Sequence, residues 1–287
     1  MNKESLTAKM CLFVKSYHYK NNYYWIYKDN LSECLLGDDY NKIYNYLGEG
    51  INYFIPNFKG NIDDGVRYIV NNNLAPSVLG RSIFCDKHLE NEIKLGLKNY
   101  LIFASGYDMS PYLNSFHNLN VYEIDQKMMI EDKIRRLKKA KIDYSFVNFI
   151  DMDLSNNIIN LELKGKSFCS LLGISYYLTK DKFDSLINNI SKIISVNSVI
   201  VFDYPTIDVS EESLINSKLA SFAGEEMKSY YSYNEIEMLL QKYNFLIYEH
   251  LDYNEMTNMY FNNYNTLNPD NKIIAKKGTA YVLAVKK

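Results

Sequence analysis

The stretch Leu101-Ile102-Phe103-Ala104-Ser105-Gly106-Tyr107-Asp108 decides the fold. It is a short apolar run that breaks at Ser-Gly and then meets an acid, which is the pattern of a buried strand entering a loop. A glycine at this point lets the backbone adopt angles closed to other residues and lets a ligand approach the main chain closely. We therefore expect Gly106 to mark the carboxyl end of a buried strand.

A second apolar run, Asn120 to Asp125, ends in a carboxylate roughly 20 residues after this glycine, the spacing at which a nucleotide-binding αβ unit places an acid on ribose hydroxyls. Taken singly, Gly106 is explained by a turn and Asp125 by a helix cap. The two together, each at a strand's carboxyl end, favour a nucleoside site.

The composition is that of an ordinary globular protein. The 287 residues are 47% hydrophobic and 23% charged, enough for one large domain or two small ones. A net charge of -2 gives no electrostatic footprint for nucleic acid. The amino-terminal segment lacks the apolar core of a signal peptide, and no apolar run approaches the roughly 20 residues needed to span a bilayer. We expect a soluble, cytoplasmic protein with no membrane partner.

No metal site is indicated. The four cysteines show no CxxC pair and are interpreted as free thiols in a reducing compartment, and the four histidines show no HxxxH or HxH pairing. These residues are Cys11, Cys34, Cys85, Cys169, His18, His88, His117 and His250.

Residues 1–95 are interpreted as a helical cap that packs on an αβ core formed by residues 96–287. Within the cap, residues 7–14 and 66–71 have a helix-like apolar pattern, Ala75-Pro76-Ser77 is expected to be a loop, and a helix is expected from Ile83 to Leu97.

In the core, strand and helix patterns alternate, which predicts βαβ units and a parallel sheet covered on both faces. The expected strands are residues 100–104, 120–125, 144–149, 167–172 and 198–204. The expected helices are residues 126–141, 155–163 and 180–195.

The carboxyl-terminal part departs from simple alternation. Residues 207–231 are polar and are interpreted as a lid over the sheet's carboxyl edge. A helix at 232–243 precedes two late strands, 244–250 and 279–286, which suggest a hairpin at one edge of the sheet. The long Asn- and Tyr-rich segment between these strands is expected to be a loop.

In a doubly wound sheet the ligand lies at the carboxyl ends of the strands, so residues that end strands are the candidates. Asp153 follows the third strand and either caps a helix or accepts a hydrogen bond from an adenine amino group, with the Leu154 N–H near a ring nitrogen. Tyr177 follows the fourth strand and either flanks a substrate or is a rim aromatic in a tyrosine-rich chain.

Arg81 is one of only four arginines. It either lies on a solvated helix face or clamps a ligand carboxylate through two parallel hydrogen bonds, and Lys15 is a weaker candidate for the same task. The third glycine of a nicotinamide-binding G-x-G-x-x-G loop is missing after Gly106, which argues against NAD without excluding it.

The order of these motifs resembles the leucine carboxyl methyltransferase family, especially its bacterial branch of S-adenosylmethionine-dependent O-methyltransferases. The family's glycine loop often contains A-S-G-x-D and its ribose motif E-x-D-Q. This chain matches them at 104–108 and 123–126, and Asp153-Leu154 and Tyr177-Leu178 follow in order. Ser5-Leu6-Thr7-Ala8, and Arg81 with Asp86, also fit.

The resemblance implies a class I methyltransferase fold, with a mostly parallel seven-stranded sheet whose last strand is antiparallel, a helical cap and a lid. It implies S-adenosylmethionine as the cofactor, with its methionine carboxylate at Arg81, its chain at Gly106 and its ribose at Asp125. The adenine would lie by Asp153 and Leu154. Three neighbours complete the implied cofactor set: Ala104, Ser105 and Gln126.

Two departures from the family pattern stand out. The family often has arginine after the loop's aspartate, where this chain has Met109. It also tends to have Glu-Gly after the fourth strand, where this chain has Leu172-Gly173, and the missing glutamate bears on cofactor affinity and on activity.

We therefore expect an S-adenosylmethionine-dependent O-methyltransferase acting on a carboxylate or hydroxyl of a small molecule or a peptide. Tyr177 is the candidate catalytic residue, and Asp203 and Tyr204 are further strand-end residues to test. Two alternatives stay open: a catalytically weak or inactive nucleoside-binding protein of the same fold, and a nicotinamide-dependent oxidoreductase.

Overall fold

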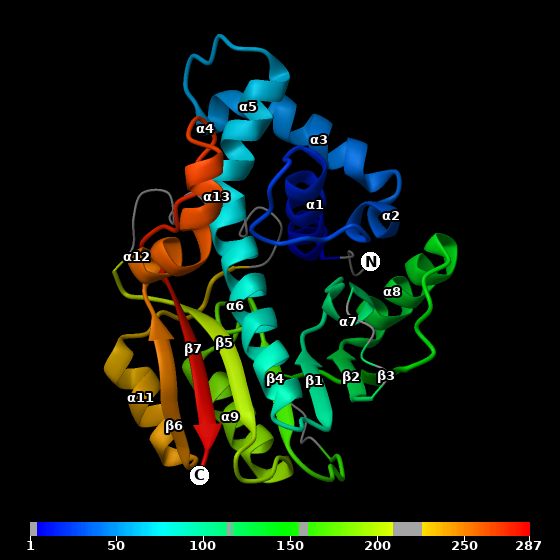
Figure 1. The fold of residues 1–287 in the computed structure, drawn as a ribbon, viewed down its shortest axis with the longest axis vertical. Helices are drawn as coiled ribbons and strands as arrows, with labels where there is room; N and C mark the ends of the chain where they lie inside the picture. The colour runs from blue at the N-terminus through cyan, green and yellow to red at the C-terminus, as the bar shows by residue number, and fades with distance from the viewer. Residues whose placement is uncertain (1–4, 114–115, 117, 155–159, 209–225) are drawn as a thin grey trace.

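The structure is a computed structural model that describes residues 5–113, 116, 118–154, 160–208 and 226–287. Its centre is a seven-stranded sheet with the order β3-β2-β1-β4-β5-β7-β6. Neighbouring strands from β3 to β5 are parallel, whereas β7 is antiparallel to both β5 and β6 (Figure 1). The strands are β1 (Asn99–Phe103), β2 (Asn120–Asp125), β3 (Val147–Asp151), β4 (Ser167–Leu171), β5 (Val199–Pro205), β6 (Phe245–Leu251) and β7 (Thr279–Lys286). The expected mostly parallel sheet with an antiparallel last strand is confirmed.

Alternation along the central strands divides the core into two layers. In β1, Tyr100 and Ile102 join the cluster that packs under helix α6, while Leu101 and Phe103 join the cluster under α9 and α11. Because successive side chains of a strand point to opposite faces, a strand buried on both faces is apolar throughout. Figure 1 shows α6 in front of the sheet and α9 and α11 behind it.

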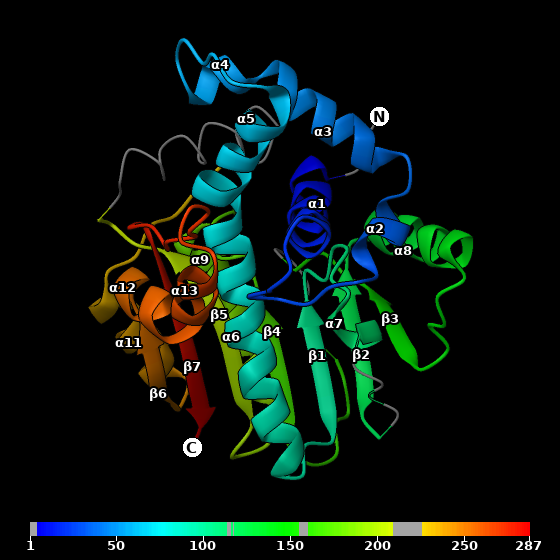
Figure 2. The same ribbon diagram turned by 45° about the horizontal axis from the view of Figure 1, so that its top comes forward.

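The helices fall into a cap, the layers that cover the sheet and a carboxyl-terminal group, and Figure 2 shows the cap above the carboxyl ends of the strands. The cap holds α1 (Leu6–Lys20), α2 (Ser32–Leu36), α3 (Asp39–Glu49), α4 (Ile51–Phe54), α5 (Ile62–Ile69) and the π-helical turn η1 (Val70–Leu74), followed by α6 (Ala75–Lys94). The others are α7 (Ser110–Leu113), α8 (Lys127–Ala140), α9 (Lys180–Ile193), α11 (Tyr233–Lys242), α12 (Tyr253–Met256), η2 (Thr257–Phe261) and α13 (Asn262–Leu267).

The prediction of a loop at residues 75–77 is wrong. Ala75 and Pro76 form the first turn of α6, where the missing N–H of proline costs nothing because the first turn has no partner for it. The helix therefore starts eight residues before the expected Ile83. This extension puts Arg81 inside a regular helix, on the wall beneath the cap.

Two further features differ from expectation. The third strand begins at Val147 rather than Tyr144, because Asp143 accepts from the Ser145 N–H and turns the chain. The segment between β6 and β7 contains α12, η2 and α13, so its prediction as a loop is wrong; a capping box in which Asp252 and Glu255 exchange hydrogen bonds starts the first of these helices.

Two expected elements fall partly outside the described residues. The helix predicted at 155–163 is not formed in residues 160–163, and the rest of it lies outside. Most of the expected lid, residues 209–225, also lies outside the described residues. The lid and the division into cap and core at residue 95 stay predictions.

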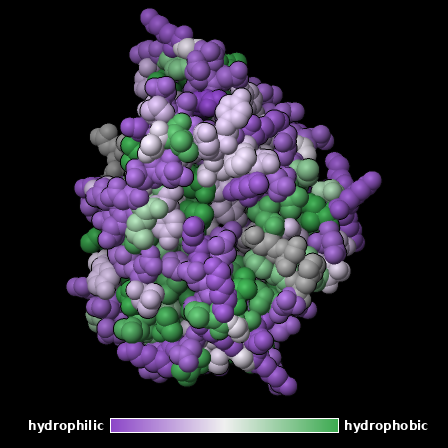
Figure 3. Space-filling view, in the orientation of Figure 1, coloured by the Kyte–Doolittle hydropathy of each residue, from purple (hydrophilic) through white to green (hydrophobic). Residues whose placement is uncertain are grey.

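The surface in Figure 3 is mainly hydrophilic, with separate apolar patches. Among the helices of the described ranges, none has the length and apolar content needed to cross a bilayer.

A buried histidine fixes the loop that follows α1. His18 is 1% exposed, and its Nε2 accepts from the Ile26 N–H at 2.9 Å, while Asn22 donates to its carbonyl oxygen at 2.8 Å. Burial lowers the pKa of His18 to about 4. The ring is therefore neutral at pH 7, as its accepting role requires.

We expect acid to weaken the cap through this group. The folded pKa lies below the ordinary value near 6.5, so the unfolded state binds the proton first and stability falls as pH drops from about 6.5 towards 4. At pH 4.5 the loss amounts to about 2–3 kcal/mol relative to pH 7. Urea unfolding of wild type and His18→Gln at both pH values measures it; equal pH dependence in the two proteins would contradict the assignment.

Candidate active site

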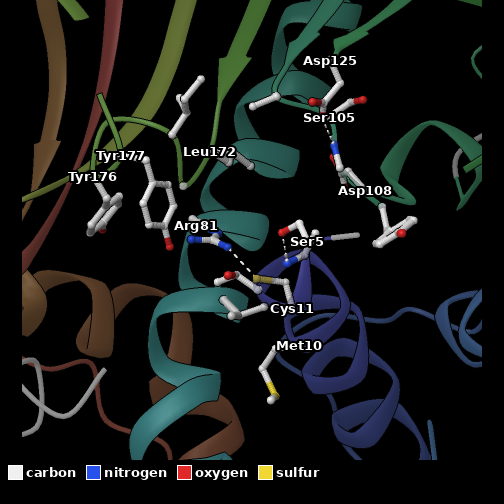
Figure 4. Close-up of a pocket in the computed structure, with 18 of the residues that line it drawn as sticks. Ser5, Met10, Cys11, Arg81, Ser105, Asp108, Asp125, Leu172, Tyr176 and Tyr177 are labelled. Atoms are coloured by element: carbon white, nitrogen blue, oxygen red, sulfur yellow. Dashed lines mark hydrogen bonds between the residues drawn. The ribbon is translucent and has the colours of Figure 1, made fainter. Parts of the chain in front are cut away.

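A cavity of about 1100 Å³ opens at the carboxyl ends of the parallel strands. Its floor comes from the loops after β1, β2, β3 and β4, and its walls from α1 and α6 (Figure 4). This is the edge at which open α/β sheets bind their ligands.

The loop after β1 is held in an unusual backbone conformation. Ala104 and Gly106 both have positive φ, 51° and 49°, a region that costs a non-glycine residue of the order of 1–3 kcal/mol. A Cβ at position 106 would lie 3.5 Å from the Ala8 Cβ of α1. This distance is an ordinary van der Waals contact, so the constraint at position 106 is the positive φ, which glycine adopts without strain.

Asp125 joins this loop to the end of β2. Its Oδ2 accepts from the Gly106 N–H and its Oδ1 from the Gln126 N–H, both at 2.7 Å. Each carboxylate oxygen can accept a second hydrogen bond, so the group suits a ligand with two adjacent hydroxyls. The Asp125 carbonyl oxygen also accepts from Met152 N–H at 2.9 Å, which brings the neighbouring segment with Asp153 and Leu154 to the same cavity.

Arg81 projects from α6 into the middle of the cavity wall (Figure 4). With the described residues its guanidinium makes one hydrogen bond, to Cys11 Sγ at 3.0 Å, and its Nη1 lies 3.6 Å from Asp203 Oδ2. Burial opposes the charge, but Cys11 and Asp203 outweigh burial and raise the pKa of Arg81. A guanidinium with five donors and so few partners is suited to a planar anionic ligand.

The loop after β4 forms the other end of the cavity, where Leu172, Tyr176 and Tyr177 line the wall. The Tyr176 hydroxyl donates to Asp203 Oδ2 at 3.1 Å, and burial raises its pKa well above the ordinary value, so it is not a base. Tyr204 pairs with His250 Nε2 at 2.9 Å and is not among the described residues that line the cavity.

A buried ion pair closes the cap onto the glycine loop. Lys15 Nζ of α1 lies 3.0 Å from Asp108 Oδ1, and Lys133 Nζ donates to the Asp108 carbonyl oxygen at 2.6 Å. Burial alone would raise the pKa of Asp108, but the charges of Lys15 and Lys133 lower it to about 2. Burial and the Asp108 charge raise the pKa of nearby Asp86 to about 7. The pair fixes the position of α1 over the loop.

Nine residues chosen from the sequence line this one cavity, whereas Asp203 and Tyr204 are not among its described lining residues. The nine are Arg81, Ala104, Ser105, Gly106, Asp125, Gln126, Asp153, Leu154 and Tyr177. Their roles towards a ligand stay predictions.

Sequence reasoning missed three contributors to the cavity. Cys11 was interpreted as a free buried thiol, yet it is the hydrogen-bond acceptor of Arg81. Asn73 and Leu74 reach the cavity because η1 inserts a π-helical turn before α6, a feature that often accompanies functional sites. The only available signal was the run of three asparagines before Pro76.

Comparison with known proteins decides the family. The model for "Leucine carboxyl methyltransferase" matches residues 13–191. The chain is also 30% identical over 313 aligned positions to the Bacillus subtilis (strain 168) protein named "Putative S-adenosyl-L-methionine-dependent methyltransferase YktD", covering 100% of this chain and 99% of that protein. The chain belongs to the leucine carboxyl methyltransferase family.

A solved structure shares the fold of this chain. An O-methyltransferase family protein from Burkholderia thailandensis, 10% identical, covers 95% of this chain and 76% of its own with a TM-score of 0.51. An S-adenosylmethionine-dependent methyltransferase from Clostridium acetobutylicum ATCC 824 is 14% identical, covers 87% of this chain and 99% of its own, and has a TM-score of 0.49. The expected class I methyltransferase fold is confirmed. By family and fold the chain is an S-adenosylmethionine-dependent methyltransferase, and the comparisons favour neither alternative raised above.

In this methyltransferase, Lys15→Met leaves the Asp108 carboxylate buried with fewer partners, and we expect a loss of about 3 kcal/mol of unfolding free energy. Because Asp108 titrates below its ordinary pKa when folded, its contribution is present above pH 4 and is lost towards pH 2. The variant lacks much of this contribution, so its deficit relative to wild type should be largest near pH 7 and should shrink as the pH falls and Asp108 is protonated in both proteins. Urea unfolding between pH 3 and pH 7 measures both effects.

Lys20→Met is the matched control. It removes an exposed ion pair to Glu33 from the same helix and should cost less than about 1 kcal/mol. The double variant Lys15→Met/Asp108→Asn should recover part of the loss. Equal costs for Lys15→Met and Lys20→Met would contradict the buried role.

Proposed function

We propose that this methyltransferase transfers the methyl group of S-adenosylmethionine to an oxygen, a carboxylate or hydroxyl, of a small molecule or a peptide. The observation that carries the proposal is the presence, in one cavity, of a carboxylate at a strand end and a guanidinium with few hydrogen-bonded partners among the described residues. Asp125 lies at the end of β2, and Arg81 faces the ends of β1 and β4.

The cofactor pose follows from the chemistry of each wall. Asp125 would accept from the ribose hydroxyls, with Gln126 beside it. The glycine loop of Ala104, Ser105 and Gly106 would let the methionine chain approach the main chain. Arg81 would bind the methionine carboxylate through two parallel hydrogen bonds.

The adenine would lie at the remaining end, beyond the ribose. The Asp153 carboxylate would accept from its amino group, and the Leu154 N–H would meet a ring nitrogen, since both residues line the cavity there.

The cavity has room for a second reactant. Pockets for one drug-sized ligand measure about 300–1,000 Å³, and this cavity of about 1100 Å³ exceeds that range. Its lining also includes Tyr177, Thr279 and Asn73 of η1, and the cavity as a whole is lined more by apolar than by polar surface. A lining of this mixed kind suits an acceptor with an apolar body and a polar head.

Methyl transfer from a sulfonium is an in-line displacement, for which the protein supplies alignment and exclusion of water. A carboxylate acceptor needs no base, because it is ionised at neutral pH. A hydroxyl acceptor needs one, and Tyr177 is the residue proposed for contact with it, since Tyr176 already donates to Asp203.

Asp125→Ala should weaken binding of S-adenosylhomocysteine by about 1–3 kcal/mol, because hydrogen bonds to a charged group are lost. Calorimetry measures the affinity. Asp151→Ala is the matched control: Asp151 is the register partner of Asp125 on β3, is exposed, and is not among the described residues lining the cavity. An unchanged affinity in Asp125→Ala would remove the ribose assignment.

Tyr177→Phe separates the two acceptor classes. With a panel of benzoic acids and phenols and labelled S-adenosylmethionine, we expect kcat for phenols to fall by about 10²-fold and kcat for acids to change little, because only the hydroxyl needs help with its proton. Affinity for S-adenosylhomocysteine is the control and should not change. Retained phenol turnover would exclude Tyr177 as the base.

A further inference from the structure

A buried carboxylate lies behind the cavity wall, between the cofactor end and the acceptor end. Asp203, in β5, is 0% exposed and is not among the described residues that line the cavity. Its Oδ1 accepts from the Gly173 N–H at 2.6 Å, and its Oδ2 accepts from the Tyr176 hydroxyl at 3.1 Å. The same Oδ2 lies 3.6 Å from Arg81 Nη1.

The distance between Arg81 Nη1 and Asp203 Oδ2 distinguishes this pair from a closely hydrogen-bonded salt bridge. A charge-assisted N–H···O contact is about 2.7–2.9 Å long, so Asp203 attracts the guanidinium without closing a bidentate pair with it. Within the described residues, the one hydrogen-bonded partner of Arg81 is the thiol of Cys11, a weak acceptor. Arg81 therefore has N–H donors in the plane of its guanidinium that can bind a stronger anionic acceptor.

The loop after β4 confines the guanidinium from the second side. Gly173 has φ +69°, and a Cβ there would lie 2.7 Å from Arg81 Nη1. The loop backbone thus packs directly on the guanidinium, and Asp203 fixes that backbone through the Gly173 N–H. The Asp203 carboxylate thus acts on Arg81 in two ways. It places a negative charge near the guanidinium, and it fixes the loop backbone against which the guanidinium packs.

A carboxylate without solvent is expensive to bury unless its partners satisfy it. Here two hydrogen bonds and one guanidinium do so, and one of the three partners is a residue that faces the cavity centre. A purely structural role would not require a charge at position 203. A neutral acceptor could take the hydrogen bonds of the Gly173 N–H and the Tyr176 hydroxyl.

We propose that Asp203 is a positioning residue, which holds the Arg81 guanidinium in the orientation that binds the carboxylate of the cofactor's methionine. The inference rests on the proposed cofactor pose. Because Asp203 also orients Tyr176, it links the cofactor end of the cavity to the wall that faces the acceptor.

The test compares two ligands that differ in the group Arg81 is proposed to bind. S-adenosylhomocysteine carries the amino acid, whereas 5′-methylthioadenosine has the same nucleoside and thioether without it. Asp203→Asn keeps an acceptor for the Gly173 N–H and removes the charge. By calorimetry we expect S-adenosylhomocysteine affinity to fall at least tenfold and 5′-methylthioadenosine affinity to stay within twofold.

Asp208→Asn is the matched control. It makes the same chemical change five residues further along the chain, at an exposed carboxylate 3.6 Å from Lys277, and should alter neither affinity. In an Arg81→Gln background, Asp203→Asn should add less than a twofold further loss, because its effect passes through Arg81.

Equal weakening of both ligands by Asp203→Asn would show a general structural role and overturn the inference, as would no weakening of either. If Asp203→Asn does not fold, Asp203→Glu is measured in the same way; it keeps the charge but displaces it, and a selective loss of at least threefold for S-adenosylhomocysteine is expected. Wild type that binds neither ligand would instead overturn the proposed function on which the inference rests.

Discussion

The buried pair between Lys15 and Asp108 is the contact on which the site depends. It joins the first helix of the cap to the loop after β1, which brings Ala8 against Gly106 and Cys11 against Arg81. Without α1 in that place, the carboxyl edge of the sheet would be an open surface. The wall that α1 forms helps to exclude water from the cavity. Methyl transfer depends on alignment of the reactants and on exclusion of water.

Charged side chains in the cavity wall are paired with opposite charges, but the pairing is looser at Arg81 than elsewhere. Lys15, Lys133 and Asp108 hold each other closely, and the pKa of Asp108 is low in consequence. Arg81, by contrast, has a distant carboxylate and a thiol. The surroundings of Arg81 orient its guanidinium without neutralising it fully, as the proposed binding of an anionic ligand requires.

The strands were predictable because each is an apolar run that ends in a polar or glycine residue, and Gly106 and Asp125 mark two of those ends. The start of α6 was not predictable, because Pro76 signals a loop in most settings and a first helical turn in a few, and only packing under the cap selects between them. The helices between β6 and β7 were missed for a similar reason: an Asn-rich composition favours loops, and burial of Met256, Phe261 and Tyr264 overrides it.

The sequence by itself determined the order of the strands, the parallel sheet and the residues that end its strands, because these depend on local periodicity and turn chemistry. It also carried the motifs by which the family is recognised. Tertiary structure alone decided which side chains surround Arg81. Cys11, Gly173 and Asp203 are separated from it by between 70 and 122 residues along the chain, and no local pattern encodes contacts made only when α1, α6 and β5 come together.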